Sequence, residues 1–182
     1  GLRREPRRDV RATVVIDDLA YPESRLHLKG ATGSFRPIDD RPSLTVKLRD
    51  DGGETTVKFH LNNAVEDPGL LNEWFGTEAF REAGVPAPRV AHARVSLNRH
   101  SLGLYVLKES FNDAFLTNHL PPGGGHLYEP VGGSDVDGSM RLAGEGNNDP
   151  EARPLQRLAL AAATPNPERR WQRLGEVLER DQ

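Results

Sequence analysis

Short segments in which apolar and polar residues alternate recur through the first 110 residues, and this pattern constrains the fold most. Alternation with a period of two places successive side chains on opposite faces of a β-strand. It is clearest at residues 44–48 and 55–61, which flank Asp-Asp-Gly-Gly at 50–53 and therefore predict a hairpin with a tight turn. Further strands are expected at residues 11–17, 25–28, 89–97 and 102–107, the last two joined by a short turn at 98–101.

One amphipathic helix is expected within this series of strands. Asp67 is suited to cap the helix and Pro68 to take its first position, while Gly84 marks its end. Between these limits, apolar residues recur at helical spacing and form a stripe that we expect to pack in the core: Leu70, Leu71, Trp74, Phe75, Ala79, Phe80 and Ala83. Residues 30–43, rich in glycine, proline and serine, are expected to form a loop between two strands.

The last third of the chain is expected to contain helices and a linker instead of strands. A short helix is expected at 112–119, then a long linker rich in Gly, Pro and Asp within 121–154, then helices at 155–163 and 167–180. The last helix has no C-cap before the chain ends, so we expect it to be cut rather than finished. The chain of 182 residues is long enough for one ordinary domain or slightly more. We predict an α+β protein with parts at 1–110, 111–154 and 155–182.

Composition excludes several classes of function. The chain has 27 acidic and 24 basic residues and a net charge of -3, which argues against a general nucleic-acid binder. A local excess of arginine near the start is expected to be a solvated arm: Arg3, Arg4, Arg7, Arg8 and Arg11. No membrane segment or signal peptide is visible, because no apolar run is long enough. With no cysteine, thiolate chemistry and disulfides are excluded, leaving carboxylates, His, Lys and backbone groups.

Metal and hydrolase motifs are not found. No two of the six histidines have the spacing of metal ligands, so no metal site is predicted: His27, His60, His92, His100, His119 and His126. Ser34, Ser101 and Ser110 lack a G-x-S-x-G context, so a hydrolase triad has no support.

Several longer strings match a known family in their order and spacing. They are LHLKGATGSFRPIDDRPSLTVKL at 26–48, KFHLNNAVEDPGLLNEWFGTEAFREAGVPAPR at 58–89, ARVSLN at 93–98 and LGLYVLKE at 102–109, with AFLTNHL and HLYEP matching more loosely. The chain resembles the CotH kinase family, the spore-coat-protein-H-like proteins with a divergent protein-kinase fold. The most specific part is KG before a Ser-containing loop, then LNN, then a DP-initiated helix ending in FREAGVPAPR.

This resemblance implies an ATP-dependent protein kinase that uses magnesium and phosphorylates Ser residues of protein substrates. It implies a kinase-like N-terminal lobe, an antiparallel sheet plus one helix, followed by the first helices of an incomplete C-terminal lobe. The family's catalytic Asp and metal-binding Asp are expected beyond residue 182, so we expect an inactive fragment of such a kinase. A bacterial cell or spore surface, or secretion, is suggested. The alternative is a non-catalytic protein-binding module for coat or surface assembly.

A phosphate-covering loop is expected at the start of the 30–43 segment. Phosphoryl transfer needs positive charge and backbone N–H donors around the nucleotide phosphates. Glycine lets the backbone approach an anion closely, although such a loop alone is more typical of a plain β-turn. With the resemblance, the loop residues are assigned to nucleotide binding: Lys29, Gly30, Gly33, Ser34 and Arg36.

An ion pair between a strand lysine and a helix glutamate is the second expectation. In a kinase-like lobe the lysine holds the phosphates and the glutamate orients the lysine, and we assign these roles to Lys58 and Glu73. Lys47 on the neighbouring strand remains open as the phosphate lysine. Glu78 and Glu82 are the other helix candidates, although surface charges at this spacing are common.

A hinge that offers backbone groups to adenine is expected at the end of the last strand, at Tyr105, Leu107 and Glu109. There Leu107 and Lys108 would act through the main chain. Asn62 and Asn63 are expected to be structural turn residues, because Asn side chains bond turn backbone.

Overall fold

The computed structural model describes residues 1–31, 33–49, 55–120, 127–131, 134–138, 140–142 and 153–178. The chain forms two compact units, Gly1–Pro122 and Gly123–Gln182, and each is described by itself. Within the described ranges, no helix is both long enough and apolar enough to cross a membrane. The tight turn predicted at 50–53 lies outside the described residues.

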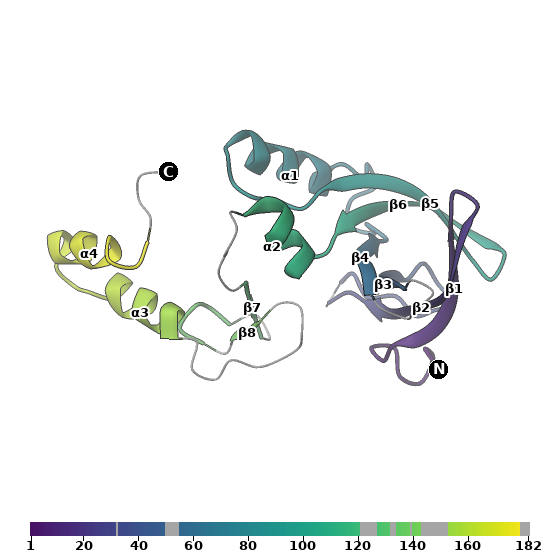
Figure 1. The fold of residues 1–182 in the computed structure, drawn as a ribbon, viewed down its shortest axis with the longest axis horizontal. Coiled ribbons are helices and arrows are strands. Elements are labelled where there is room, and N and C mark those ends of the chain that lie inside the picture. Colours follow the sequence, from purple (N-terminus) through teal and green to yellow (C-terminus); the bar gives the residue numbers. More distant parts are fainter. Residues whose placement is uncertain are drawn as a thin grey trace. The chain divides into compact units, whose positions relative to one another are not determined.

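The first unit is built on a six-stranded antiparallel sheet with the strand order β1-β2-β3-β4-β6-β5 (Figure 1). Each strand pairs with antiparallel neighbours, and the two predicted hairpins β3–β4 and β5–β6 are present. The α+β prediction is therefore confirmed. The strands are β1 (Val10–Ile16), β2 (Leu19–Lys29), β3 (Ser43–Arg49), β4 (Thr55–Asn62), β5 (Val90–Leu97) and β6 (His100–Glu109).

A third hairpin, β1–β2, was not predicted. Its turn is made by Asp17 and Asp18, whose φ angles of 48° and 69° lie in the left-handed region that Asp tolerates better than most residues. Strand β2 begins at Leu19, whereas the sequence predicted a strand only from residue 25. The early part of β2 was missed because Pro22 and its polar neighbours interrupt the apolar alternation.

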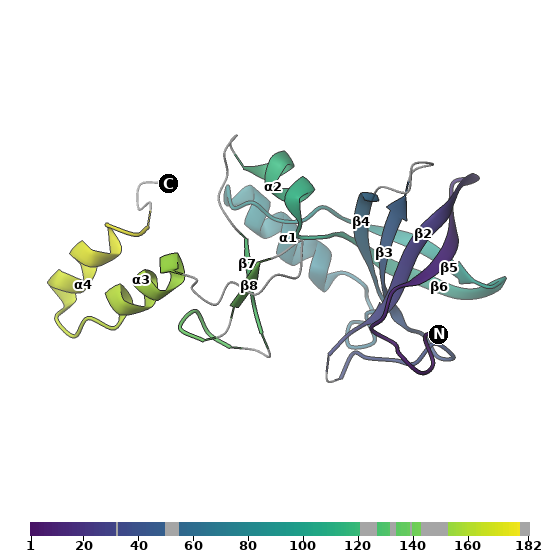
Figure 2. The same ribbon diagram turned by 60° about the horizontal axis from the view of Figure 1, so that its bottom comes forward.

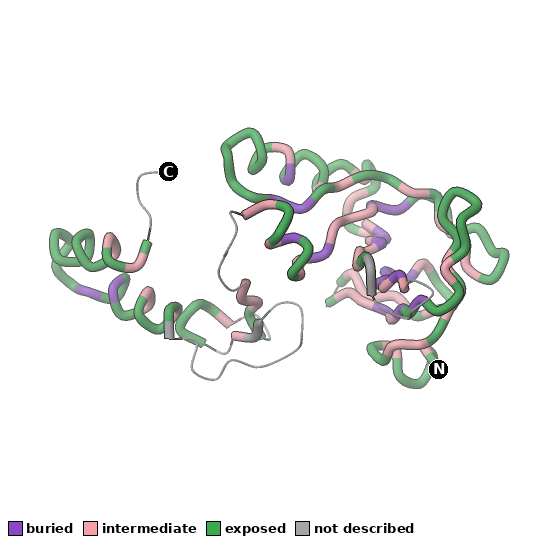
Figure 3. The backbone as a smooth tube through the Cα atoms, in the orientation of Figure 1, coloured by how far each residue is buried: buried purple, intermediate pink, exposed green. Residues whose placement is uncertain are grey.

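The core lies on one face of the sheet. Its buried side chains come from the central strands: Leu26, Leu28, Leu44, Val46, Leu48, Leu61 and Tyr105. Figure 3 shows the buried residues of this unit gathered mainly in the strands. Burial of each such side chain contributes about 1.5–3 kcal/mol. The sheet is curled (Figure 2), and an apolar groove on this face is lined by both edge strands, β1 and β5.

Helix α1 (Asn72–Glu82) begins later than the sequence predicted. A carboxyl oxygen of Asp67 accepts a hydrogen bond from the Asn72 N–H at 2.8 Å, so Asp67 does bind a free N–H group at the helix start. However, Leu70 has a φ of 58°, which is incompatible with a helix. The residues after Asp67 therefore form a turn, and the predicted start at Asp67-Pro68 is wrong.

The aromatic residues of α1 are exposed, so the prediction that they pack in the core is wrong. Trp74, Phe75 and Phe80 are 38%, 59% and 59% exposed, and Thr77 is the buried residue of this helix. Figure 3 shows α1 exposed along most of its length. The reason is that α1 contacts the sheet through a polar side, where Glu73 bonds to strand residues. The apolar stripe of α1 faces away from these contacts.

A second helix, α2 (Asp113–His119), follows β6 and agrees with the prediction. The side chain of Asn112 caps it by accepting a hydrogen bond from the Phe115 N–H at 3.0 Å. Phe115 is buried and contacts the rings of Phe111 and His119. Helix α2 is therefore fixed at its first turn and through its aromatic side.

The second unit contains the hairpin of β7 (Tyr128–Pro130) and β8 (Met140–Leu142), then α3 (Arg153–Ala162) and α4 (Pro167–Leu174). The hairpin lies within the segment predicted to be a linker. Asn166 caps α4, and Arg170 bonds to the carbonyl of Thr164 at 2.7 Å, which closes the turn between the two helices. Helix α4 ends at Leu174 before Gly175, so the predicted extent to residue 180 is wrong.

Candidate functional site

All four lysines of the chain lie on one face of the sheet, opposite the core. The strands β2, β3, β4 and β6 contribute one each: Lys29, Lys47, Lys58 and Lys108. Residues directly opposite one another on paired strands share a face, and Lys47 lies opposite Lys58. In the neighbouring row, His27, Thr45, His60 and Lys108 lie opposite one another from β2 to β6. We call these four lysines with His27 and His60 the cationic face.

One carboxylate from α1 reaches this face and joins two of its lysines. Lys108 Nζ lies 3.0 Å from Glu73 Oε2. The other oxygen of Glu73 accepts a hydrogen bond from the side-chain amide of Asn62 at 2.5 Å, and Asn62 Oδ1 accepts one from Lys29 Nζ at 2.7 Å. Charges and dipoles alternate along this chain of contacts, so each member orients the next. We call Lys29, Asn62, Glu73 and Lys108 the Glu73 network.

The network includes two predicted site residues, Lys29 and Glu73, and two residues whose side chains were not predicted to belong to the site, Asn62 and Lys108. Glu73 does contact a strand lysine, but that lysine is Lys108, whereas the sequence reasoning assigned Lys58. Lys58 lies on the same face, one row away, opposite Lys47. Lys108 was expected to act only through its main chain. The alternation along β6 was the available signal, because it places Lys108 opposite His60.

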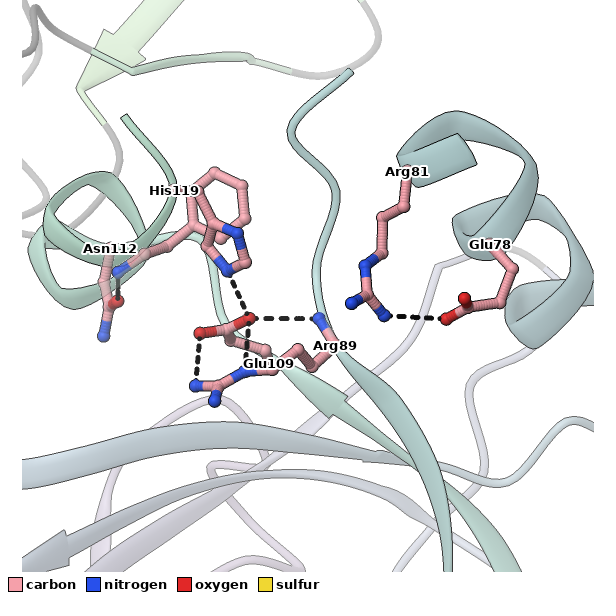
Figure 4. A network of polar contacts seen from close by, with 7 residues as sticks. Glu78, Arg81, Arg89, Glu109, Asn112 and His119 are labelled. Carbon is pink, nitrogen blue, oxygen red and sulfur yellow. Dashed lines mark hydrogen bonds and ion pairs between the residues drawn. The ribbon is translucent and has the colours of Figure 1, made fainter. Parts of the chain in front are cut away.

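The alternative helix partner Glu78 is engaged elsewhere. It pairs with Arg81 on the same helix at 2.8 Å (Figure 4). This is a local helical contact between residues three positions apart, which contributes a few tenths of a kcal/mol. Glu73 is thus the α1 carboxylate that joins the cationic face.

Two pKa shifts report the crowding of positive charge on the cationic face. Burial, together with the nearby charges of Lys29, Lys58 and Lys108, lowers the pKa of His60 to about 3. His60 is therefore neutral at pH 7, and its Nδ1 lies 3.1 Å from the hydroxyl of Thr45. Burial also lowers the pKa of Lys29, and Lys108 and Arg7 lower it further, although Glu73 opposes this. Lysine charges held close together favour the binding of an anion.

In the predicted phosphate loop, the described residues 30, 31 and 33–36 bond to one another. Gly30 has a φ of 118°, and a Cβ there would lie 2.9 Å from the backbone of Phe35, so glycine is required. The Ser34 hydroxyl accepts a hydrogen bond from the Ala31 N–H at 3.1 Å. The guanidinium of Arg36 donates to the carbonyls of Gly33 and Phe35, both at 2.8 Å. The side chains of Ser34 and Arg36 thus both bond to the backbone of the loop.

Asn63 joins Ser34 to Arg41 in the longer connection between β2 and β3. It is buried, and its amide donates to the carbonyls of Ser34 at 3.1 Å and Arg41 at 2.8 Å. Its backbone N–H donates to the Ser43 hydroxyl at 2.9 Å. Asn63 therefore has the structural role that was expected for it, whereas Asn62 belongs to the Glu73 network.

Glu109, predicted to lie at a nucleotide hinge, is held by its neighbours (Figure 4). Its carboxylate accepts hydrogen bonds from the Arg89 backbone N–H and guanidinium, and lies 3.0 Å from His119 Nε2. Burial alone would raise the pKa of Glu109, but the bonds from Arg89 and His119 outweigh it and lower the pKa to about 2. Its N–H donates to the Arg89 carbonyl at 2.9 Å. The side chain thus links β6 to α2.

The donor set of the cationic face suits a phosphate group and does not suit a metal ion. Ammonium groups are hydrogen-bond donors for phosphate oxygens, whereas Mg²⁺ requires oxygen ligands. Within the part of the chain that the structure describes, no group of three or more acidic or histidine side chains could hold a metal. These residues therefore do not form a magnesium site by themselves.

In a comparison with protein-family models, the chain matches the model described as CotH kinase protein over residues 26–181. The match includes all four lysines and the Glu73 network, and it excludes the segment before residue 26. A comparison with curated proteins gives no match.

Proposed function

The chain belongs to the CotH kinase protein family, and on this premise we propose that its cationic face binds the phosphates of ATP. Membership of a kinase family implies the use of ATP. We assign the phosphate contacts to Lys29, Lys58 and Lys108. Glu73 has the role of orienting Lys108.

The observation that carries this proposal is the Glu73 network. Catalysis of phosphoryl transfer depends on positioned positive charge around the phosphates, and a lysine fixed by a helix glutamate is one way to position it. The Lys108–Glu73 pair at 3.0 Å has this form. The pKa of Lys29 is lowered by burial and by neighbouring cations, which disfavour its charged form. This supports the same role, because the negative charge of a bound phosphate would stabilise the charged form of Lys29.

The wider proposal is that this chain contributes the nucleotide-binding part of a protein kinase that phosphorylates Ser residues of protein substrates with ATP and magnesium. The sheet and α1, within residues 1–110, would act as a kinase-like N-terminal lobe. Residues 111–154 would connect it to the first helices of a C-terminal lobe at 155–182. The glycine loop at 30–36 would lie over the phosphates, and the N–H groups of Ala31, Ser34 and Phe35, which bond within the loop, would have to be released to contact them.

Calorimetric titration of the chain with ATP, with and without Mg²⁺, tests this proposal. Lys108→Met removes one charge-assisted contact, so we expect the Kd for ATP to rise about tenfold. Glu73→Gln leaves Lys108 in place but removes the group that orients it, and should weaken binding in the same direction. Glu78→Gln is the matched control, because it removes a carboxylate of the same helix that pairs only with Arg81 among the described contacts.

The proposal is contradicted if ATP fails to bind the folded wild-type chain, or if Glu73→Gln and Glu78→Gln change the Kd equally. Circular dichroism of each variant confirms that it is folded. Binding without magnesium is also informative, because it separates the lysine contacts from those of the metal.

A second candidate function is a non-catalytic module that binds a protein in coat or surface assembly. The exposed aromatic side of α1 favours it, because large exposed apolar patches are typical of interaction surfaces: Leu71, Trp74, Phe75, Phe80 and Val85. This function predicts that ATP has no effect on the thermal midpoint of the folded chain.

A further inference from the structure

The segment before β1 lies along the sheet instead of extending into solvent. The carbonyl of Pro6 accepts a hydrogen bond from the Leu28 N–H at 2.8 Å, and the guanidinium of Arg7 donates to the carbonyl of Gly30. Arg7 also lies over the ring of Phe35, 5.4 Å from its centre. Arg7 is exposed, as expected for a solvated arm, but it is held in place by these contacts. We call residues 1–9 the N-terminal arm.

Asp9, at the end of this arm, places a carboxylate on the cationic face. One oxygen lies 2.7 Å from His27 Nδ1 and the other lies 2.7 Å from Lys47 Nζ. The register that pairs Val10 with Leu26 explains this position, because it brings Asp9 beside His27 across the β1–β2 pair. The three side chains are 24%, 23% and 29% exposed, so all are largely shielded from water.

A carboxylate with both oxygens on nitrogen donors resembles a phosphate group in charge and in hydrogen-bond geometry. Asp9 binds Lys47, which lies opposite Lys58, one of the lysines assigned to phosphate binding above. An anion that reaches Lys58 would find the Lys47 ammonium as the next donor on the face. In the arm-docked state that donor is already occupied by Asp9.

We propose that Asp9 is an internal competitor for the phosphates of a nucleotide on the cationic face. This proposal rests on the proposed function of that face. With the arm docked, Lys47 is bound to Asp9 and unavailable to ligand. When the arm is released, Lys47 and His27 become free and the face binds polyphosphate more tightly. The family match begins at residue 26, so Asp9 lies outside it, whereas its partners His27 and Lys47 lie within it.

Apart from the contacts of Asp9, the arm is held by the backbone hydrogen bond of Pro6, by Leu2 packed against the core, by Arg7 and by weak ion pairs. Its other ion pairs are exposed: the side chains of Arg3 and Asp39 are 75% and 61% exposed, and those of Arg8 and Glu5 are 72% and 55% exposed. Exposed ion pairs contribute little, about 0–1 kcal/mol. Removal of the Asp9 charge should therefore weaken arm docking while the core remains intact.

The test measures the Kd of Mg·ATP and of inorganic tripolyphosphate for the whole chain and three variants. For Asp9→Asn we expect both Kd values to fall about fivefold, because one more ammonium becomes available. Glu5→Gln, which removes a carboxylate of the same arm, should leave them unchanged. In the double variant Asp9→Asn with Lys47→Gln this gain should be lost, because the ammonium that Asp9 releases is then absent.

Equal or weaker binding by Asp9→Asn overturns the proposal, and so does an undiminished gain in the double variant. Circular dichroism of each variant confirms that it is folded at the temperature of the titration. If tripolyphosphate binds more tightly to Asp9→Asn but ATP does not bind, the competition stands and the proposed function fails. If neither ligand binds Asp9→Asn at millimolar concentration, both are overturned.

Discussion

At the scale of single residues, the positions of charged groups follow from register more than from residue type. Lys58 was chosen for the Glu73 partner because it is a strand lysine close to α1 in sequence. The structure instead joins Glu73 to Lys108, which is distant in sequence but lies in the row of His60. Which lysine contacts Glu73 depends on the strand order. Strand β4 pairs with β6, although α1 and β5 lie between them in the sequence. Sequence patterns predict each strand but do not determine such pairing.

His60 provides a test at this scale that needs no mutation. Burial and the charges of Lys29, Lys58 and Lys108 lower its pKa to about 3, so its imidazole should stay neutral from pH 8 to pH 5. An anion on the cationic face offsets the lysine charges, so tripolyphosphate should raise this pKa. NMR titration of the imidazole signals measures both effects. A His60 that titrates near its ordinary value of 6.5 without ligand would contradict the crowding of charge.

At the scale of elements, the sequence predicted most of the strands and helices, and the errors have identifiable causes. The hairpins β3–β4 and β5–β6 were found because apolar alternation is strong on both sides of each turn. The start of α1 was placed too early because Asp67-Pro68 resembles a cap, although a left-handed Leu70 follows it. Helical periodicity identified an apolar side of α1 but could not indicate whether anything covers it.

Asn63 is the residue on which the 30–42 loop depends most. Asn63→Ala removes the donors to the carbonyls of Ser34 and Arg41 and leaves these groups without that partner, so we expect a loss of about 2 kcal/mol in the free energy of unfolding. Urea denaturation measures it. Asn72→Ala, at an exposed position, is the control and should change stability by less than about 0.5 kcal/mol. Similar losses in both variants would show that the loop does not depend on Asn63.

The link between β6 and α2 should make stability depend on pH. Glu109 has a pKa of about 2 in the folded chain against 4.5 for the free group, because Arg89 and His119 stabilise its charged form. The unfolded chain then binds the proton first, so this stabilisation is complete above pH 4.5 and is lost as the pH falls toward 2.

Glu109→Gln measures this contribution. The wild type should lose about 2 kcal/mol more than the variant between those limits, a value reduced for partial solvent screening. Thermal unfolding of both proteins across this pH range provides the comparison. Parallel stability curves for the two proteins would exclude the link as a source of pH dependence.

At the scale of the whole molecule, the fold separates apolar and cationic side chains onto the two faces of one sheet. The core occupies one face, and every lysine of the chain occupies the other. The α+β class and the strands could be predicted, because they depend on local periodicity. The assembly of the cationic face could not, because it depends on long-range strand order and on two carboxylates, Asp9 and Glu73, that approach from outside the sheet.

The most direct test of the central claim is acetylation of the chain at low reagent dose, followed by mass spectrometry, with and without Mg·ATP. The four lysine amines are the reactive side-chain amines of this chain, and adenosine, which has no phosphates, is the control ligand. We predict that ATP slows acetylation of Lys29, Lys58 and Lys108 in proportion to site occupancy, while adenosine leaves the rates unchanged. Equal rates at these three lysines with saturating ATP would contradict the assignment of the cationic face as the nucleotide site.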